Sequence, residues 1–156
     1  PKEILASFDL VVASIHNGFN MTEEAATQRL ITAIENPFTT ILGHPTGRLL
    51  LAREGYPVNH HKIIDACAAN GVAIELNANP YRLDMDWKWI PYALEKGVWI
   101  SINPDAHAKE GLQDVFWGVE VARKAGLTPE NCLNALPRIA FEQWLKQKKT
   151  NLHLPA

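Results

Sequence analysis

The sequence predicts an α/β fold in which four β-strands lie parallel in one sheet. Short apolar runs rich in β-branched residues alternate four times with segments whose apolar residues recur at helical spacing. Such repeated strand and helix units form parallel sheets with right-handed crossovers. At 156 residues, 47% of them hydrophobic and 21% charged, the chain is long enough to bury the core of one globular domain or of part of one.

All four predicted strands end in the same kind of sequence. Each apolar run stops at turn-forming residues, and polar or ionisable side chains follow at once. We assign the strands to residues 8–15, 39–42, 72–77 and 98–102. The carboxyl ends of parallel strands meet at one edge of the sheet, so we expect the following residues to lie together there: His16, His44, Asn77, Asn79, Asp105 and His107.

Start and stop signals define the predicted helices. Thr22 and Asp86 stand where N-cap residues are expected, and Gly71 and Gly97 follow helical segments as left-handed terminators. A short further helix is expected at Thr128-Pro129. The main helices are predicted over residues 23–36, 58–70, 87–96, 112–125 and 137–148.

Composition and charge exclude several classes of protein. The net charge of −2 argues against a protein that binds nucleic acid by bulk electrostatics, although a pocket that holds one or two phosphates is compatible with it. Cys67 and Cys132 lie in helix-like segments and are expected to be small core residues, not a disulfide or a metal pair. With no bilayer-spanning apolar run and no leader segment, we expect a soluble intracellular chain without a membrane partner.

Asp105 and His107 stand one residue apart at the end of the fourth apolar run. On an extended backbone such residues share a face, so a carboxylate and an imidazole can converge on one cation such as zinc, manganese or iron. The alternative is a turn in which Asp105 caps the next helix and His107 is merely polar. His16 and His44, at two other strand ends, favour a metal site over that alternative.

Four ordered motifs resemble the C-terminal half of the PHP (polymerase and histidinol phosphatase) domain. They are VASIH at 12–16, ILGHPTGR at 41–48, ELNANPYRLD at 75–84 and SINPDAH at 101–107. The GRLLL and NPYRLD stretches are most similar to the PHP domain at the end of bacterial family X DNA polymerases. The resemblance covers nearly the whole chain.

This resemblance implies the C-terminal part of a distorted (β/α)7 TIM-like barrel with up to three divalent metals, manganese or zinc with iron as a further candidate. It implies a phosphoesterase and, in the polymerases, a manganese-dependent 3′→5′ exonuclease of the bacterial cytoplasm. His16, Asp105 and His107 match metal ligands, and His44 matches the histidine at the rim of that site. Asp105 and His107 are accordingly the catalytic candidates.

The family's His-x-His strand and its further ligands lie upstream of residue 1. We therefore expect residues 1–156 to be the C-terminal portion of a single PHP domain, without its upstream strands or any polymerase domain. Half a barrel exposes two sheet edges, so its partner is expected to be the missing N-terminal half of the barrel or a second copy of the chain. We expect the chain alone to be far less active than its parent.

Three cationic residues near strand exits, Arg48, Arg82 and Lys109, are candidates to hold phosphate oxygens, with Asn79 beside them. The alternative for each cation is a surface salt bridge. The substrate would be a DNA 3′ end or another phosphoester. Two other functions remain open: a small-molecule phosphatase of the histidinol phosphatase type, for which a closed pocket would be evidence, and an inactive structural fragment.

Overall fold

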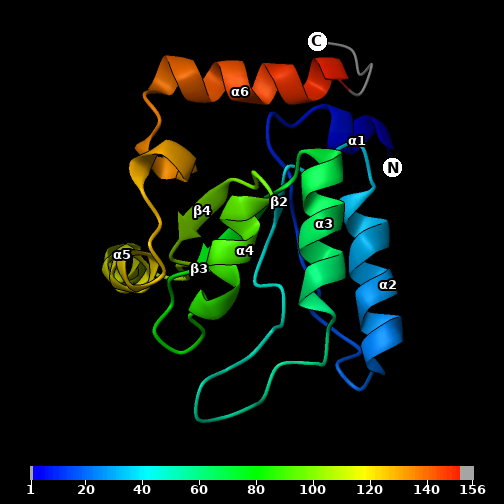
Figure 1. Ribbon diagram of the computed structural model, residues 1–156, viewed down its shortest axis with the longest axis vertical. Helices are drawn as coiled ribbons and strands as arrows, with labels where there is room; N and C mark the ends of the chain where they lie inside the picture. The colour runs from blue at the N-terminus through cyan, green and yellow to red at the C-terminus, as the bar shows by residue number, and fades with distance from the viewer. Residues whose placement is uncertain (1, 152–156) are drawn as a thin grey trace.

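Four parallel strands form one sheet in the order β1-β2-β3-β4, and Figure 1 labels β2, β3 and β4. They are β1 (Val12–Ala13), β2 (Ile41–Leu42), β3 (Ala73–Asn77) and β4 (Ile100–Asn103). This computed structural model describes residues 2–151. The predicted α/β class is confirmed, and an open parallel sheet of this kind is consistent with part of an α/β barrel. The TIM-like barrel itself stays a prediction.

The first strand is much shorter than the apolar run that predicts it. Only Val12 and Ala13 pair with β2, and Phe8, at the start of the predicted strand 8–15, is 55% exposed. Among residues 2–151, β1 has a neighbouring strand on one side only. An apolar run becomes a strand only where a partner backbone lies beside it, which hydrophobicity alone does not reveal.

The five main predicted helices are present, although two of them begin with a 3₁₀ turn. The segment predicted over 87–96 comprises η1 (Trp87–Trp89) and α4, and that over 112–125 comprises η2 (Glu110–Asp114) and α5. The short helix expected at Thr128-Pro129 is a 3₁₀ turn, η3 (Pro129–Asn131), followed by η4 (Leu133–Ala135). The α-helices are α1 (Lys2–Ala6), which is not among the predicted elements, α2 (Glu23–Ile34), α3 (His60–Asn70), α4 (Ile90–Glu95), α5 (Val115–Lys124) and α6 (Arg138–Asn151).

Local capping signals explain why several of these boundaries are predictable. The Thr22 hydroxyl accepts a hydrogen bond from the Ala25 N–H at the start of α2. Asp86 likewise accepts from the Lys88 N–H. Gly71 ends α3 in the left-handed conformation, with φ 59°.

Alternating strand residues give the sheet two different faces. Leu42, Ile74 and Ile100 point to the outer face, where they are buried together with Leu30 of α2 and Ile64 of α3. Helices α2, α3, α4 and α5 all contribute to this core. The outer face therefore holds the main apolar core of the chain.

The opposite face, which we call the inner face, is apolar only near the amino ends of the strands. Ile41 and Ala73, the first residues of β2 and β3, are buried there with Leu133. Phe141 and Trp144 of α6 pack against this cluster. Helix α6 therefore lies across the amino ends of the strands, away from the long loops that follow their carboxyl ends (Figure 1).

The free edge of β4 is covered by the segment 132–134. Cys132 forms a parallel bridge with Ile100. The Asn134 side chain accepts from the Ile102 N–H at 2.7 Å and donates to the Ile102 carbonyl at 2.8 Å. The expectation of two bare sheet edges is therefore wrong for β4, because an amide side chain substitutes for a neighbouring strand. Within residues 2–151, the outer edge of β1 has no strand beside it.

Cys67 and Cys132 are both buried free thiols, as expected of small core residues. Burial raises the pKa of the Cys67 thiol to about 12, so this side chain is an unreactive part of the core. Among residues 2–151, no helix combines the length and the apolar character needed to cross a bilayer.

Candidate active site

A row of polar side chains crosses the carboxyl half of the inner face. Glu75 of β3 is at its centre, and its carboxylate accepts from the His44 backbone N–H at 2.7 Å. The same carboxylate accepts from the amide nitrogens of Asn77 at 3.2 Å and Asn103 at 2.9 Å. The Asn77 amide also donates to Asp105 Oδ2 at 3.2 Å. Hydrogen bonds therefore connect the ends of β2, β3 and β4.

Glu75 is a site residue that sequence reasoning missed. It is only 5% exposed, and burial raises the pKa of its carboxyl group, although the hydrogen bonds it accepts oppose that shift. The available signal was a charged residue inside a continuous apolar strand, between Ile74 and Leu76. Such a residue needs several polar partners to be buried, and these partners indicate a site.

His16 and His44 come together at the ends of β1 and β2, with their ring centroids 5.0 Å apart. His44 is 6% exposed, and its Nδ1 is buried without a hydrogen-bond partner among residues 2–151. His16 is exposed, and its Nε2 lies 2.8 Å from Ser14 Oγ. A buried imidazole nitrogen without a partner, beside a second imidazole, is an arrangement that a bound cation would satisfy.

Asp105 and His107 follow β4 in a turn and not on an extended strand. The strand ends at Asn103, and Asp105 has a φ of 52°, so the expected strand-like geometry of this pair is wrong. His107 Nδ1 lies 2.8 Å from the Asp105 carbonyl oxygen. A carbonyl only accepts, so Nδ1 carries the proton and Nε2 of the neutral ring keeps a lone pair. The alternative, in which Asp105 caps the next helix, is also wrong, because Lys109 is the N-cap of η2 and the Asp105 carboxylate contacts Asn77 and Arg82.

The Asp105 carboxylate forms an ion pair with Arg82, whose Nε lies 3.2 Å from Asp105 Oδ2. Both side chains are partly exposed, at 27% and 20% respectively. They open onto a pocket of about 350 Å³, whose lining comprises Leu49, Leu50, Ala52, Asn79, Tyr81, Arg82, Asp105 and His107. Two of the four predicted substrate-binding residues, Arg82 and Asn79, thus line the same pocket as Asp105.

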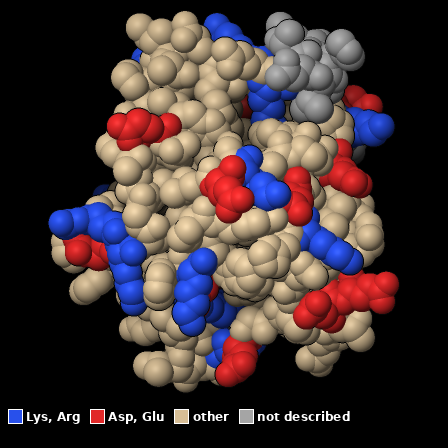
Figure 2. All heavy atoms as spheres, viewed as in Figure 1, with Lys and Arg blue, Asp and Glu red and all other residues tan. Residues whose placement is uncertain are grey.

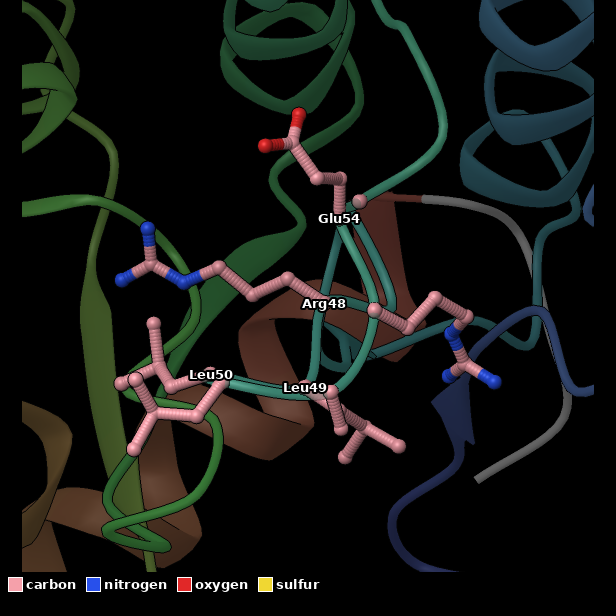
Figure 3. Close-up of a pocket in the computed structure, with 8 residues that line it drawn as sticks. Arg48, Leu49, Leu50 and Glu54 are labelled. Carbon is pink, nitrogen blue, oxygen red and sulfur yellow. The ribbon is translucent and has the colours of Figure 1, made fainter.

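Arg48 and Lys109 are placed differently. The Arg48 guanidinium donates to the Arg82 carbonyl at 2.8 Å and to the Leu83 carbonyl, and it lies 3.4 Å from the Asp86 carboxylate. Figure 3 shows Arg48 extending from its loop while Glu54 points another way; both line a second pocket, of about 500 Å³. Arg48 therefore ties two loops together, and Lys109 is exposed and is not among the residues that line the 350 Å³ pocket.

The predicted metal ligands form two pairs, His16 with His44 and Asp105 with His107, which the Glu75 row connects. Within residues 2–151, no group of three or more His, Cys, Asp and Glu side chains lies together as a complete metal site. The donor types nevertheless suit zinc, manganese or iron, and the unpartnered His44 Nδ1 offers a buried donor. The residues present therefore fit part of a metal centre.

The sequence is 42% identical over 145 residues to a Bacillus subtilis protein named DNA polymerase/3′-5′ exonuclease PolX. This similarity covers 93% of the chain, and with the four motifs described above it decides the family. The chain belongs to the PHP family. No family model matches the sequence.

Other relatives of this PHP chain are named probable phosphatases. One from Thermoanaerobacter sp. is 29% identical over 162 aligned positions, which cover 97% of the chain. One from Caldanaerobacter subterraneus is 33% identical over 116 positions, which cover 69% of the chain. The chain spans 25% of the Bacillus protein, 63% of the Thermoanaerobacter protein and 43% of the Caldanaerobacter protein.

Proposed function

We propose that this PHP chain is part of a metal-dependent phosphoesterase that removes nucleotides from DNA 3′ ends. The observation that carries the proposal is the row of hydrogen-bonded side chains that joins the His16 and His44 pair to Asp105, beside Arg82 in an open pocket. Imidazole and carboxylate donors with an adjacent guanidinium are the groups that metal-assisted phosphoryl chemistry uses.

The metals would be manganese or zinc, with iron as a further candidate. The His16 and His44 pair would supply ligands to one ion, and Asp105 and His107 would supply ligands to another. When bound, such a cation supplies Lewis acidity to a phosphoryl oxygen and lowers the pKa of bound water. His107 would use Nε2 for this role, since its Nδ1 proton is committed to the Asp105 carbonyl. His44 would use its unpartnered buried nitrogen.

Arg82 would hold the phosphate. Its Nε is engaged by Asp105, but a guanidinium has five N–H donors, so others remain to donate to a phosphoryl oxygen at the pocket. In the reaction, a water oxygen bonds to phosphorus and the bond from phosphorus to the leaving 3′ oxygen breaks. A proton from the water passes to that oxygen, which gives a nucleoside 5′-monophosphate and a strand one nucleotide shorter.

Similarity to a named polymerase and exonuclease over 93% of the chain supports a strand end as the substrate. Similarity to two named probable phosphatases supports a second candidate, a small-molecule phosphatase that uses the same side chains. The possible metal ligands within residues 2–151 do not form a complete site, which supports ligands from outside these residues. We expect the remaining ligands to come from a segment, or a second copy, that pairs with the open edge of β1.

The experiment compares Asp105→Ala with the unmodified parent protein that carries this chain, on an end-labelled single strand with manganese. Loss of an anionic ligand should reduce nucleotide release by more than about 100-fold, the upper effect of outer-shell changes at metal sites. Any polymerase activity of the parent should persist. Asp65→Ala, an exposed aspartate of α3, is the matched control and should digest DNA normally.

Undiminished digestion by Asp105→Ala would remove this residue from the mechanism. Hydrolysis of small phosphomonoesters with no attack on DNA would favour the phosphatase candidate. The chain alone should be far less active than its parent, and equal activity would show that residues 1–156 contain every group the reaction needs.

A further inference from the structure

Tyr81 presents its ring to solvent at the 350 Å³ pocket although its backbone is held at both ends. The residue is 70% exposed. Its N–H donates to Asn79 Oδ1 at 2.9 Å, and its carbonyl accepts from the Leu50 N–H at 2.6 Å. A large aromatic side chain that is exposed on a held backbone contributes little to the core, so its placement at a pocket indicates contact with a ligand.

The lining of this pocket changes character from one part to another. Leu49, Leu50 and Ala52 contribute apolar surface next to Tyr81, whereas Arg82 and Asp105 contribute charge. A terminal nucleotide has the same division, because its base offers an apolar π-face and its phosphate is anionic. The apolar part of the pocket thus suits the base of a nucleotide, and the arginine in the charged part suits its phosphate.

We infer that Tyr81 is a stacking platform for the base of the terminal nucleotide in a single DNA strand whose phosphate meets Arg82. This inference rests on the proposed function and adds the means by which a strand end is held. Because every base has a π-face, the platform accepts any base and imposes no sequence.

Stacking also supplies affinity that the overall charge does not. The net charge is −2, and Figure 2 shows acidic and basic side chains interspersed on the face it draws. A strand end therefore gains little from long-range attraction, and a local aromatic contact beside one arginine accounts for capture.

The test is a binding cycle that uses the parent protein and a short single strand with a fluorophore at its 5′ end. Fluorescence anisotropy is measured in EDTA, so that hydrolysis does not consume the probe. Tyr81→Ala should weaken binding about tenfold, within the range found for single base–aromatic stacks, and Tyr81→Phe should bind as the unmodified protein does. Phe116→Ala, which removes a 57% exposed aromatic of α5, is the matched control and should have no effect.

A second strand, which lacks the base of its 3′-terminal nucleotide, completes the cycle. The unmodified protein should bind it about tenfold more weakly than the normal strand, and Tyr81→Ala should bind both strands equally. Equal affinity of the unmodified protein and Tyr81→Ala for the normal strand would overturn the inference. So would displacement of the strand by an equal concentration of a nucleoside monophosphate, which would assign the platform to free nucleotides.

The binding cycle and the nuclease assay fail separately. If the cycle holds while Asp105→Ala digests DNA normally, the base platform stands and the proposed role of Asp105 falls. If Asp105→Ala abolishes digestion while Tyr81→Ala binds the strand as tightly as the unmodified protein does, the proposed function stands and the platform is refuted.

Discussion

Thr46 and Asp84 join the loops that follow β2 and β3 through two hydrogen bonds. The Thr46 N–H donates to Asp84 Oδ2 at 3.0 Å, and the Thr46 hydroxyl donates to Oδ1 at 2.9 Å. Asp84 is completely buried, and burial raises the pKa of its carboxyl group although these hydrogen bonds oppose the shift. This contact fixes two loops that supply walls of the pocket.

We predict that Asp84→Asn raises the thermal stability of the chain at neutral pH. An asparagine oxygen still accepts from the Thr46 N–H and its amide donates to the hydroxyl, so both hydrogen bonds survive without a buried charge. A carboxyl group with a raised pKa keeps its proton in the folded chain at pH values where the unfolded chain has lost it. Its contribution to stability is therefore complete below the ordinary pKa of 3.8 and is lost as the pH rises through the folded value.

The measurement is the melting temperature of both proteins between about pH 4 and about pH 8, where the advantage of Asp84→Asn should grow with pH. Asp84→Ala, which removes both hydrogen bonds, should lose about 1–3 kcal/mol at the acid end of this range, and the loss should shrink as the pH rises. Equal pH slopes for the unmodified protein and Asp84→Asn would contradict the prediction. The slope would then belong to Glu75, a second buried carboxyl group whose pKa is raised.

Gly118→Ala should destabilise the chain although alanine favours helices. A Cβ at Gly118 of α5 would lie 2.5 Å from Ala78 Cβ and 2.6 Å from Ile102 Cγ2. Overpacking of this kind costs about 1–3 kcal/mol, against a gain of about 1 kcal/mol from helix propensity. Thermal unfolding compares this variant with Glu120→Ala, an exposed position of the same helix that should change little. A higher melting temperature for Gly118→Ala would show that α5 does not approach β4 this closely.

Lys148 should make the chain more stable as the solution becomes mildly alkaline. Its Nζ donates to the carbonyls of Asn70 and Gly71 at 3.0 and 3.2 Å, and burial lowers its pKa from 10.5 to about 8. Between those two values the unfolded chain binds more protons than the folded chain, so stability rises with pH. Denaturant unfolding at about pH 8 and about pH 10 should show this rise, and Lys148→Met should reduce it. Lys62→Met, at an exposed lysine of α3, should leave it intact.

The isolated chain should self-associate through the outer edge of β1. Val12 lies on this edge and is 46% exposed, and no strand among residues 2–151 covers it. Sedimentation velocity over a range of concentrations should show dimers or larger species, and Val12→Lys should shift them toward monomer. Val119→Lys, at a 40% exposed apolar position of α5, tests whether any added charge has the same effect. A monomer at all concentrations would contradict this prediction and show that the chain is stable with this edge uncovered.

Most of the sequence signals that succeeded are local ones. Thr22 and Gly71 mark helix boundaries through hydrogen bonds and dihedral angles within a few residues, so the pattern alone predicts them. The meeting of His16 with His44 was also predictable, because parallel strands bring their carboxyl ends to one edge. The family resemblance added which residues at this edge match metal ligands of the PHP domain.

The residues that escaped prediction depend on neighbours distant in the sequence. Glu75 is a site residue only because His44, Asn77 and Asn103 surround it. The backbone of Tyr81 is held at the pocket by a hydrogen bond from the Leu50 N–H, 31 residues earlier. No periodicity records such contacts, and the left-handed conformation of Asp105 likewise has no marker in a non-glycine residue.

The position of α6 determines how the protein can be attached to a solid support. Gln143 of α6 is exposed on the side of the sheet that holds the amino ends of the strands, opposite the pocket. Because both native cysteines are buried, Gln143→Cys would provide an accessible thiol for a maleimide-coated bead or sensor chip. Molecules immobilised this way would all face the liquid with the Tyr81 end outward, so DNA capture could be followed without the surface blocking it.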